Sequence, residues 1–234
     1  GTIALRDLAR GETETIEEVE LSVAWPAIAK SLGATGHFVW RGERVDASLS
    51  LSDFLAALSG ERAGLKFRVN APPLKLAFDG HIGHLPTLKV EGTLAADSES
   101  LRNALLWVGQ KPLPGGGFGR FSLKAQMHAV GNTVALSGVN VELDGNAAEG
   151  VLTFVAHRNT LMQGTLAAEE LDITPYISDL RLRDESEREW NRVPFVLDGF
   201  GGLDFDLRLS ASRILAGGAK LGRTAIGAAL RDGR

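Results

Sequence analysis

Residues 121–129 carry the strongest structural signal in the sequence, a strict alternation of apolar and polar side chains. Phe121, Leu123 and Met127, with two alanines, point to one side of an extended chain, and the Ser, Lys, Gln and His between them point to the other. A period of two is typical of a β-strand with one buried and one solvated face. The sequence therefore predicts a half-buried strand here, around which the rest of the chain is organised.

A second strand follows a turn at Gly131 and Asn132, a pair that tolerates the positive φ of tight hairpins. Its apolar residues are Val134, Leu136, Val139, Val141 and Leu143. These apolar residues have even numbers before Gly138 and odd numbers after it. In a regular strand half of them would therefore point to the wrong face, unless the strand contains one extra residue at this point. We therefore predict a β-bulge at Gly138, and a bulge bends a sheet.

The unit continues with strands at residues 150–156 and 161–168, separated by turns at residues 144–146 and 157–160. Thr174 and Pro175 then have the pattern of a helix start, with Thr as N-cap and Pro at the first helical position. The fold class that we predict is mainly β: a long, curved antiparallel meander sheet with a few short helices, either groove-forming or sandwich-like.

Composition agrees with a soluble folded chain of this kind. The 234 residues are 44% hydrophobic, 23% charged and only 6% aromatic, with 28 glycines, so the apolar surface is mostly aliphatic and the backbone bends often. The net charge of −4, with acids and bases interspersed, argues against nucleic acid as a partner. Because the chain has no Cys, disulfide and thiolate chemistry are excluded.

The remainder of the chain also has the pattern of strands with short helices between them. We predict further strands at residues 18–25, 38–40, 45–51, 65–69, 74–78, 88–95 and 203–209, and helices at residues 26–32, 53–59 and 98–108. Ser52 and Ser98 are the N-caps that we expect for the last two helices, and Gly60 is expected to end the helix at residues 53–59. We predict one β-rich domain, a piece of a longer protein, with sub-units 1–110 and 118–234 joined by the Pro- and Gly-rich linker 111–117.

One short sequence occurs twice. Gly-Thr-Leu-Ala-Ala at residues 92–96 recurs at residues 164–168, and in both places a helix start comes next. Either the chain repeats a unit of several strands and one short helix, or two strands of small residues coincide by chance.

No catalytic or cofactor-binding pattern is present. His81 and His84 flank a turn without a third ligand, the glycines before Phe118 lack the Lys and Ser/Thr of a phosphate loop, and Asp204 and Asp206 share their face with an arginine. We therefore expect no enzyme activity, no cofactor and no metal site.

The predicted strands offer more apolar surface than the short helices can cover. Either two sheets close on each other as a sandwich, or one sheet forms a groove for an apolar ligand. In the groove interpretation the lipid-binding residues are Phe121, Leu123, Met127, Leu136, Val139, Val141, Leu143, Phe205, Leu207 and Leu209.

Several segments together resemble the AsmA family of bacterial envelope proteins. They are residues 33–38 (GATGHF), 97–107 (DSESLRNALLW), 121–124 (FSLK), 134–145 (VALSGVNVELDG), 149–153 (EGVLT), 164–167 (GTLA), 171–176 (LDITPY) and 203–209 (LDFDLRL). The resemblance covers most of the chain, although these motifs are structural and none is a catalytic signature.

The resemblance implies a β-rich periplasmic body that a separate N-terminal helix anchors in the inner membrane. It implies a part in outer-membrane biogenesis, as in bridge-like lipid transfer proteins that hold phospholipid acyl chains in a hydrophobic β-groove. The partner that we expect is thus phospholipid or another acyl-chain lipid. The alternative is a structural or interaction module that docks envelope proteins, influences outer-membrane protein assembly and has no lipid groove.

Overall fold

The computed structural model describes residues 1–6, 13–27, 30–84, 86–110, 116–157, 159–177 and 203–231. The strands in these ranges are β1 (Ile3–Arg6), β2 (Thr13–Ala24), β3 (Leu32–Trp40), β4 (Glu43–Leu51), β5 (Ala63–Asn70), β6 (Lys75–Gly83), β7 (Lys89–Ser98), β8 (Phe121–Val130), β9 (Thr133–Leu143), β10 (Asn146–Ala156), β11 (Thr160–Asp172), β12 (Leu203–Ala216), β13 (Ala219–Leu221) and β14 (Thr224–Leu230). The helices are α1 (Phe54–Ser59), α2 (Leu101–Trp107) and α3 (Thr174–Ile177).

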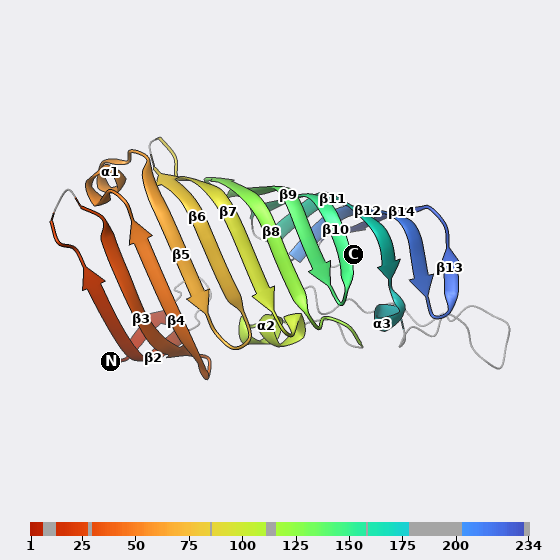
Figure 1. Cartoon of the computed structure of the whole chain (residues 1–234), viewed down its shortest axis with the longest axis horizontal. Helices are drawn as coiled ribbons and strands as arrows, with labels where there is room; N and C mark the ends of the chain where they lie inside the picture. The colour runs from red at the N-terminus through yellow and green to blue at the C-terminus, as the bar shows by residue number, and fades with distance from the viewer. Residues whose placement is uncertain are drawn as a thin grey trace.

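All fourteen strands belong to one sheet, and their spatial order follows the chain from β1 to β13, with β14 paired to β12 (Figure 1). The predicted meander is therefore confirmed. Within the described ranges the sheet does not close on itself or pack on a second sheet, so the sandwich alternative is wrong and the molecule is a single curved layer.

One pair of strands departs from the antiparallel pattern. β12 runs parallel to β11, with Thr160 opposite Leu203 and Asp172 opposite Leu215. A parallel neighbour requires a connection that returns to the starting end of the previous strand. The residues between the two strands are 173–202, of which 173–177, with α3, are described. The simple alternation of directions ends at β11.

The predicted bulge at Gly138 is confirmed. Lys124 of β8 pairs with Asn140 and Gln126 pairs with Ser137, so two residues of β9 lie opposite the single residue Ala125. Gly138 has a φ of 54°, a left-handed conformation that glycine adopts without a steric penalty. The bulge preserves the apolar side of β9 on either side of the parity change.

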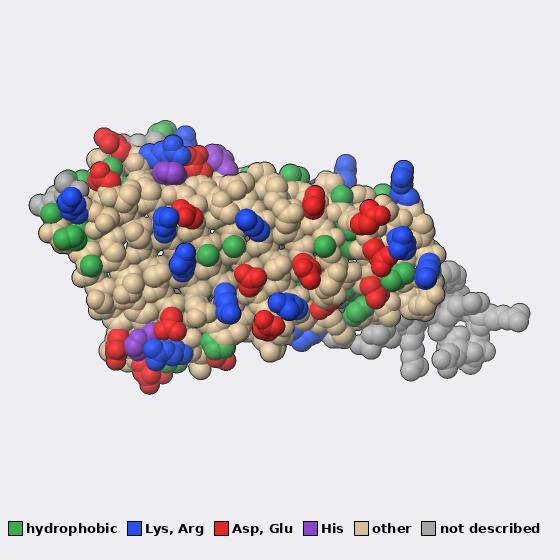
Figure 2. All heavy atoms as spheres, in the orientation of Figure 1, with side chains coloured by type: hydrophobic (Ala, Val, Ile, Leu, Met, Phe, Trp, Pro, Cys, Tyr) green, Lys and Arg blue, Asp and Glu red, His purple; other side chains and the backbone are tan. Residues whose placement is uncertain are grey.

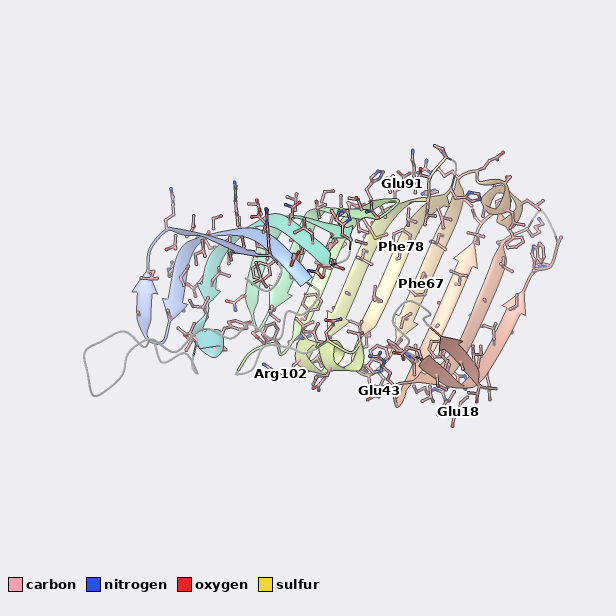
Figure 3. All side chains as sticks on the ribbon, turned by 180° about the vertical axis from the view of Figure 1, so that it is seen from behind. Glu18, Glu43, Phe67, Phe78, Glu91 and Arg102 are labelled. Atoms are coloured by element: carbon pink, nitrogen blue, oxygen red, sulfur yellow. The ribbon has the colours of Figure 1, made fainter. Side chains whose placement is uncertain are left out.

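The register assigns every strand residue to one of two faces. Leu123 lies opposite Ala96 in β7 and Val141 in β9, whereas Lys124 lies opposite Ala95 and Asn140. We call the side with Leu123 the apolar face and the side with Lys124 the polar face. Lys, Arg, Asp and Glu side chains are scattered across the side seen in Figure 2, and Figure 3 presents the reverse side, labelled at Phe67 and Phe78.

The curvature of the sheet depends on glycines within strands. Gly36, Gly80, Gly92, Gly150 and Gly164 all lie on the apolar face, by the register that links each to its neighbours. A Cβ at Gly36 would overlap the carbonyl oxygen of Glu20, and one at Gly164 would overlap that of Val151. Neighbouring backbones approach each other too closely here for any side chain, which marks sites where a sheet bends.

The helices lie at the ends of strands rather than over either face (Figure 1). Their caps differ from those that we predicted. The N-cap of α1 is Asp53 and not Ser52, and the N-cap of α2 is Ser100 and not Ser98. The predicted end of α1 at Gly60 is confirmed, since this residue has a φ of 85°. Ser52 instead accepts a hydrogen bond from the Gly64 N–H, because its hydroxyl faces β5.

Two other predicted elements have different outcomes. Of the predicted helix at residues 26–32, residues 28 and 29 lie outside the described residues, and the described ones are not helical. The Lys30 N–H donates to the Ala27 carbonyl, and Leu32 already belongs to β3. α3 begins at Thr174, one residue before the predicted first helical position Pro175, and the carboxylate of Asp172 accepts the Thr174 N–H.

The sheet runs without interruption across the proposed sub-unit boundary, because β7 and β8 pair along their whole length. Residues 111–115 of the predicted linker lie outside the described residues. The two copies of the Gly-Thr-Leu-Ala-Ala sequence occupy equivalent places, in β7 before α2 and in β11 before α3. The next strand differs in direction between the two copies, since β8 is antiparallel to β7 and β12 is parallel to β11.

Two glycines of β3 provide a matched test of the bending sites. Gly36→Ala should destabilise the protein by about 1–3 kcal/mol, because the new methyl group meets the β2 backbone. Gly33→Ala should be neutral or slightly stabilising, since the nearest atom to its Cβ position is 4.0 Å away. Urea unfolding of both variants measures the difference, and equal effects would contradict the close-approach account.

Candidate functional groove

All ten predicted lipid-binding residues lie on the apolar face. In β8 and β9, Met127 lies opposite Leu136 and Leu123 lies opposite Val141. Leu207 of β12 joins the same face through Gly164 of β11 and Leu152 of β10. The structure therefore brings residues from distant parts of the sequence onto one continuous surface.

The central part of this surface is packed against itself. Ala125, Leu136 and Val139 form a buried cluster, and Val139 has an exposed fraction of 0%. Partly buried side chains from five neighbouring strands close around it: Leu94, Leu123, Met127, Val134, Val141, Leu152, Phe154 and Leu166. Leu136 and Val139 are thus core residues, because the bend of the sheet brings the side chains of one face together.

A second buried cluster lies farther along the apolar face. Leu171, Ala211 and Ile214 form it, and Leu209 packs against it from β12. Of the other predicted residues on β12, Leu207 and Phe205 are half-buried. The C-terminal half of the apolar face is therefore largely filled by its own side chains as far as β12, whereas Ile226 of β14 has an exposed fraction of 43%.

The N-terminal end of the apolar face is open. Leu21 and Val23 of β2 have exposed fractions of 67% and 56%, and Leu49 of β4 has 39%. The register places all three on the apolar face, through Gly36 and Ala34 of β3. None of the three was among the predicted site residues, although the alternation at residues 18–25 was a visible signal.

Two hollows among the described residues open on the polar face, contrary to where a lipid groove would be expected. One, of about 920 Å³, crosses the strands from β7 to β12. Its lining includes several alanines together with Lys124, Glu142 and Glu149. Of the predicted residues only Leu123 and Val141 line it, and the charged surroundings make it a poor site for an acyl chain.

A second hollow, of about 450 Å³, crosses β3 to β7. Thr35, Ser48, Lys66 and Asp79, which belong to the polar face, contribute to its lining. Both hollows are consistent with the saddle shape that strand twist imposes on a long sheet, concave in one direction on each face.

A polar and aromatic contact joins the N-terminal strands to α2. The indole Nε1–H of Trp107 donates to the Trp40 carbonyl at 3.0 Å, and Arg41 donates to the Trp107 carbonyl. The two indole rings meet edge to face at 4.7 Å. Arg41 also pairs with Glu14 of β2, and the hydrogen bonds from Arg41 and Trp40 lower the pKa of the Glu14 carboxyl.

A second cluster lies at the ends of strands on the same side of the sheet. Asp144, in the turn between β9 and β10, accepts the N–H groups of Phe118 and Gly119 and the hydroxyl of Tyr176. Tyr176 stacks edge to face on Phe118, which Arg102 of α2 covers from 5.6 Å. Partial burial and the Asp144 carboxylate raise the pKa of Tyr176. Together the two clusters connect strand ends, loops and helices along one side of the sheet, from β2 to α3.

The side chains considered for metal binding do not come together. His81 lies 3.3 Å from an Arg62 nitrogen, and the described residues hold no group of three His, Cys, Asp or Glu side chains suited to a metal ion. Among the same residues no helix has the length and apolar character needed to cross a membrane.

A scan of known protein families, a search of curated proteins and a search of solved structures each returned no match for this chain.

Isosteric substitutions can test the difference between the two ends of the apolar face. Val139→Thr should cost about 1–3 kcal/mol, because it buries a hydroxyl group without a partner. Val23→Thr places the same group where water reaches it, so the change should stay within about 0.5 kcal/mol. Chemical denaturation measures the free energy of unfolding of both variants. Equal losses of that free energy would mean that the apolar face is covered uniformly.

Proposed function

We propose that this chain is a non-enzymatic, lipid-handling segment that holds acyl chains on the apolar face of its sheet. The observation that carries the proposal is a single unclosed sheet with one continuous apolar face, which no described helix covers. Apolar surface left in water costs roughly 25 cal/mol per Å², so a ligand that covers the open part gains that free energy on binding.

Acyl chains enter at the N-terminal end in this proposal. Leu21, Val23 and Leu49 are exposed there and share the face with the packed centre. The packed centre keeps the sheet folded without ligand, so that the open end can load and release lipid without global unfolding.

The resemblance to the AsmA family supplies the cellular setting of the proposal. In this setting the chain lies in the periplasm as part of a protein anchored in the inner membrane, its ligand is phospholipid and its process is outer-membrane biogenesis. The lack of charged side chains among the ten predicted residues and the three exposed ones suits acyl chains rather than a polar ligand.

A second candidate is an interaction module that docks envelope proteins and influences outer-membrane protein assembly. The observation that favours it is that, among the described strands, β1 and β14 each have one side without a neighbour, where their backbone groups can accept another strand. Capture of the same partner by lipid-free and lipid-loaded protein would support this candidate over the first.

Lipid loading can be tested with a triple variant of the open end. Leu21→Gln, Val23→Gln and Leu49→Gln together should abolish co-purifying phospholipid and uptake of a fluorescent fatty acid, because they make the entrance polar. All three positions are exposed, so the far-ultraviolet circular dichroism spectrum should remain that of the wild type. Native mass spectrometry after mild extraction measures the bound lipid.

The matched control carries three glutamines on the polar face of the same part of the sheet: Ser22→Gln, Thr35→Gln and Ser50→Gln. These positions are also exposed and should leave lipid uptake unchanged. Absence of lipid from the wild type, or equal loss in both triple variants, would count against the proposal.

A further inference from the structure

The two ends of the sheet carry opposite charge. Residues 1–29 contain six Asp or Glu and two Arg, whereas residues 203–234 contain six Lys or Arg and three Asp. The first segment includes β1, which carries Arg6, and β2 at the N-terminal edge, and the second includes β12, β13 and β14 at the other edge. A net charge of −4 for the whole chain conceals this separation.

Some of these charges are used within the chain, and others remain exposed at the edges. Glu14 pairs with Arg41, Glu20 lies 3.6 Å from His37, and Arg213 pairs with Glu170. Glu17 and Glu18 are exposed on β2, and Lys220, Arg223 and Arg231 are exposed beside β13 and β14. Acidic and basic side chains are thus available on opposite ends of one molecule.

Both edges also offer unpaired backbone within the described part of the chain. β1 pairs only with residues 13–16 of β2, and no described strand lies on the outer side of Leu21 to Ala24. At the other end β14 pairs with β12 on one side only. β14 contains seven residues without a charge or a proline, so nothing in it opposes the addition of a further strand.

The strand directions at the two edges are compatible. Neighbouring strands from β1 to β11 are antiparallel, so β1 and β11 point in the same direction. β12 also points that way, because it is parallel to β11, and β14 points the opposite way, because it is antiparallel to β12. A second copy displaced along the sheet would therefore place its β14 antiparallel to β1. The same displacement keeps the apolar face on one side, because Ile226 of β14 and Ile3 of β1 both belong to it.

We propose that copies of this chain associate head to tail, the basic β13–β14 edge of one copy adding to the acidic β1–β2 edge of the next. The occupant of each edge is a second copy, identified by the complementary charge of the two edges. Such a contact is heterologous, so it extends into open chains rather than closing a dimer. The proposal concerns the edges and does not rest on lipid binding.

Sedimentation velocity of the wild-type protein over a wide range of concentration is the first test. The mean mass should rise with concentration at about 0.05 M salt and should fall back toward the monomer at about 0.5 M, because salt screens exposed charges. A protein that stays monomeric at low salt would overturn the proposal, and so would association that salt does not weaken.

Charge reversal at each edge is the second test. Glu17→Lys with Glu18→Lys replaces two exposed acids of β2 by bases, and Lys220→Glu with Arg223→Glu replaces two exposed bases beside β14 by acids. Each variant alone should associate at least about tenfold more weakly than the wild type. An equimolar mixture should recover association, because the unchanged basic edge of the first variant can meet the unchanged acidic edge of the second, and the two altered edges can meet each other. This recovery also demonstrates that both variants are folded.

Lys75→Glu with Lys89→Glu is the matched control, because both lysines are exposed on strands inside the sheet. It should associate like the wild type. Association that survives reversal of an edge, a mixture that remains monomeric, or equal weakening by the control would each overturn the head-to-tail contact.

Discussion

A sheet that stands alone can bury its apolar face only with the side chains of that same face, and the rest of this structure depends on that constraint. Burial then requires the sheet to bend until side chains of neighbouring strands meet. Val139 is fully buried although no described helix or second sheet lies over it, because residues of five strands converge on its cluster. The bend is therefore the source of the core.

Backbone glycines and contacts at the strand ends both stabilise this bend. Glycines such as Gly36 and Gly164 remove the Cβ atoms that would hold adjacent strands apart on the inner side. On one side of the sheet, the Trp40–Trp107 contact and the Asp144–Tyr176 hydrogen bond connect the strand ends with α2 and α3. The bend is strong enough to bury the centre, while Leu21 and Val23 at the N-terminal end stay exposed. The packed core and the exposed N-terminal end are thus parts of one surface.

Much of the fold could be predicted from local sequence, because strand periodicity and turn residues are local properties. The alternation at residues 121–129, the bulge at Gly138 and the stop of α1 at Gly60 are confirmed for that reason. The parallel direction of β12 was missed, because it depends on the course of a long connection. The pattern also could not distinguish the buried Val139 from the exposed Val23, since curvature decides which apolar residues meet.

Photo-crosslinking with a diazirine fatty acid, mapped by peptide mass spectrometry, tests most directly whether the open end of the apolar face holds lipid. The account predicts that labels concentrate on Leu21, Val23 and Leu49, with little on the polar-face neighbours Ser22 and Ser50. Labels concentrated on Ala95 and Ala147, in the hollow of the polar face, would contradict it, as would uniform labelling of both faces.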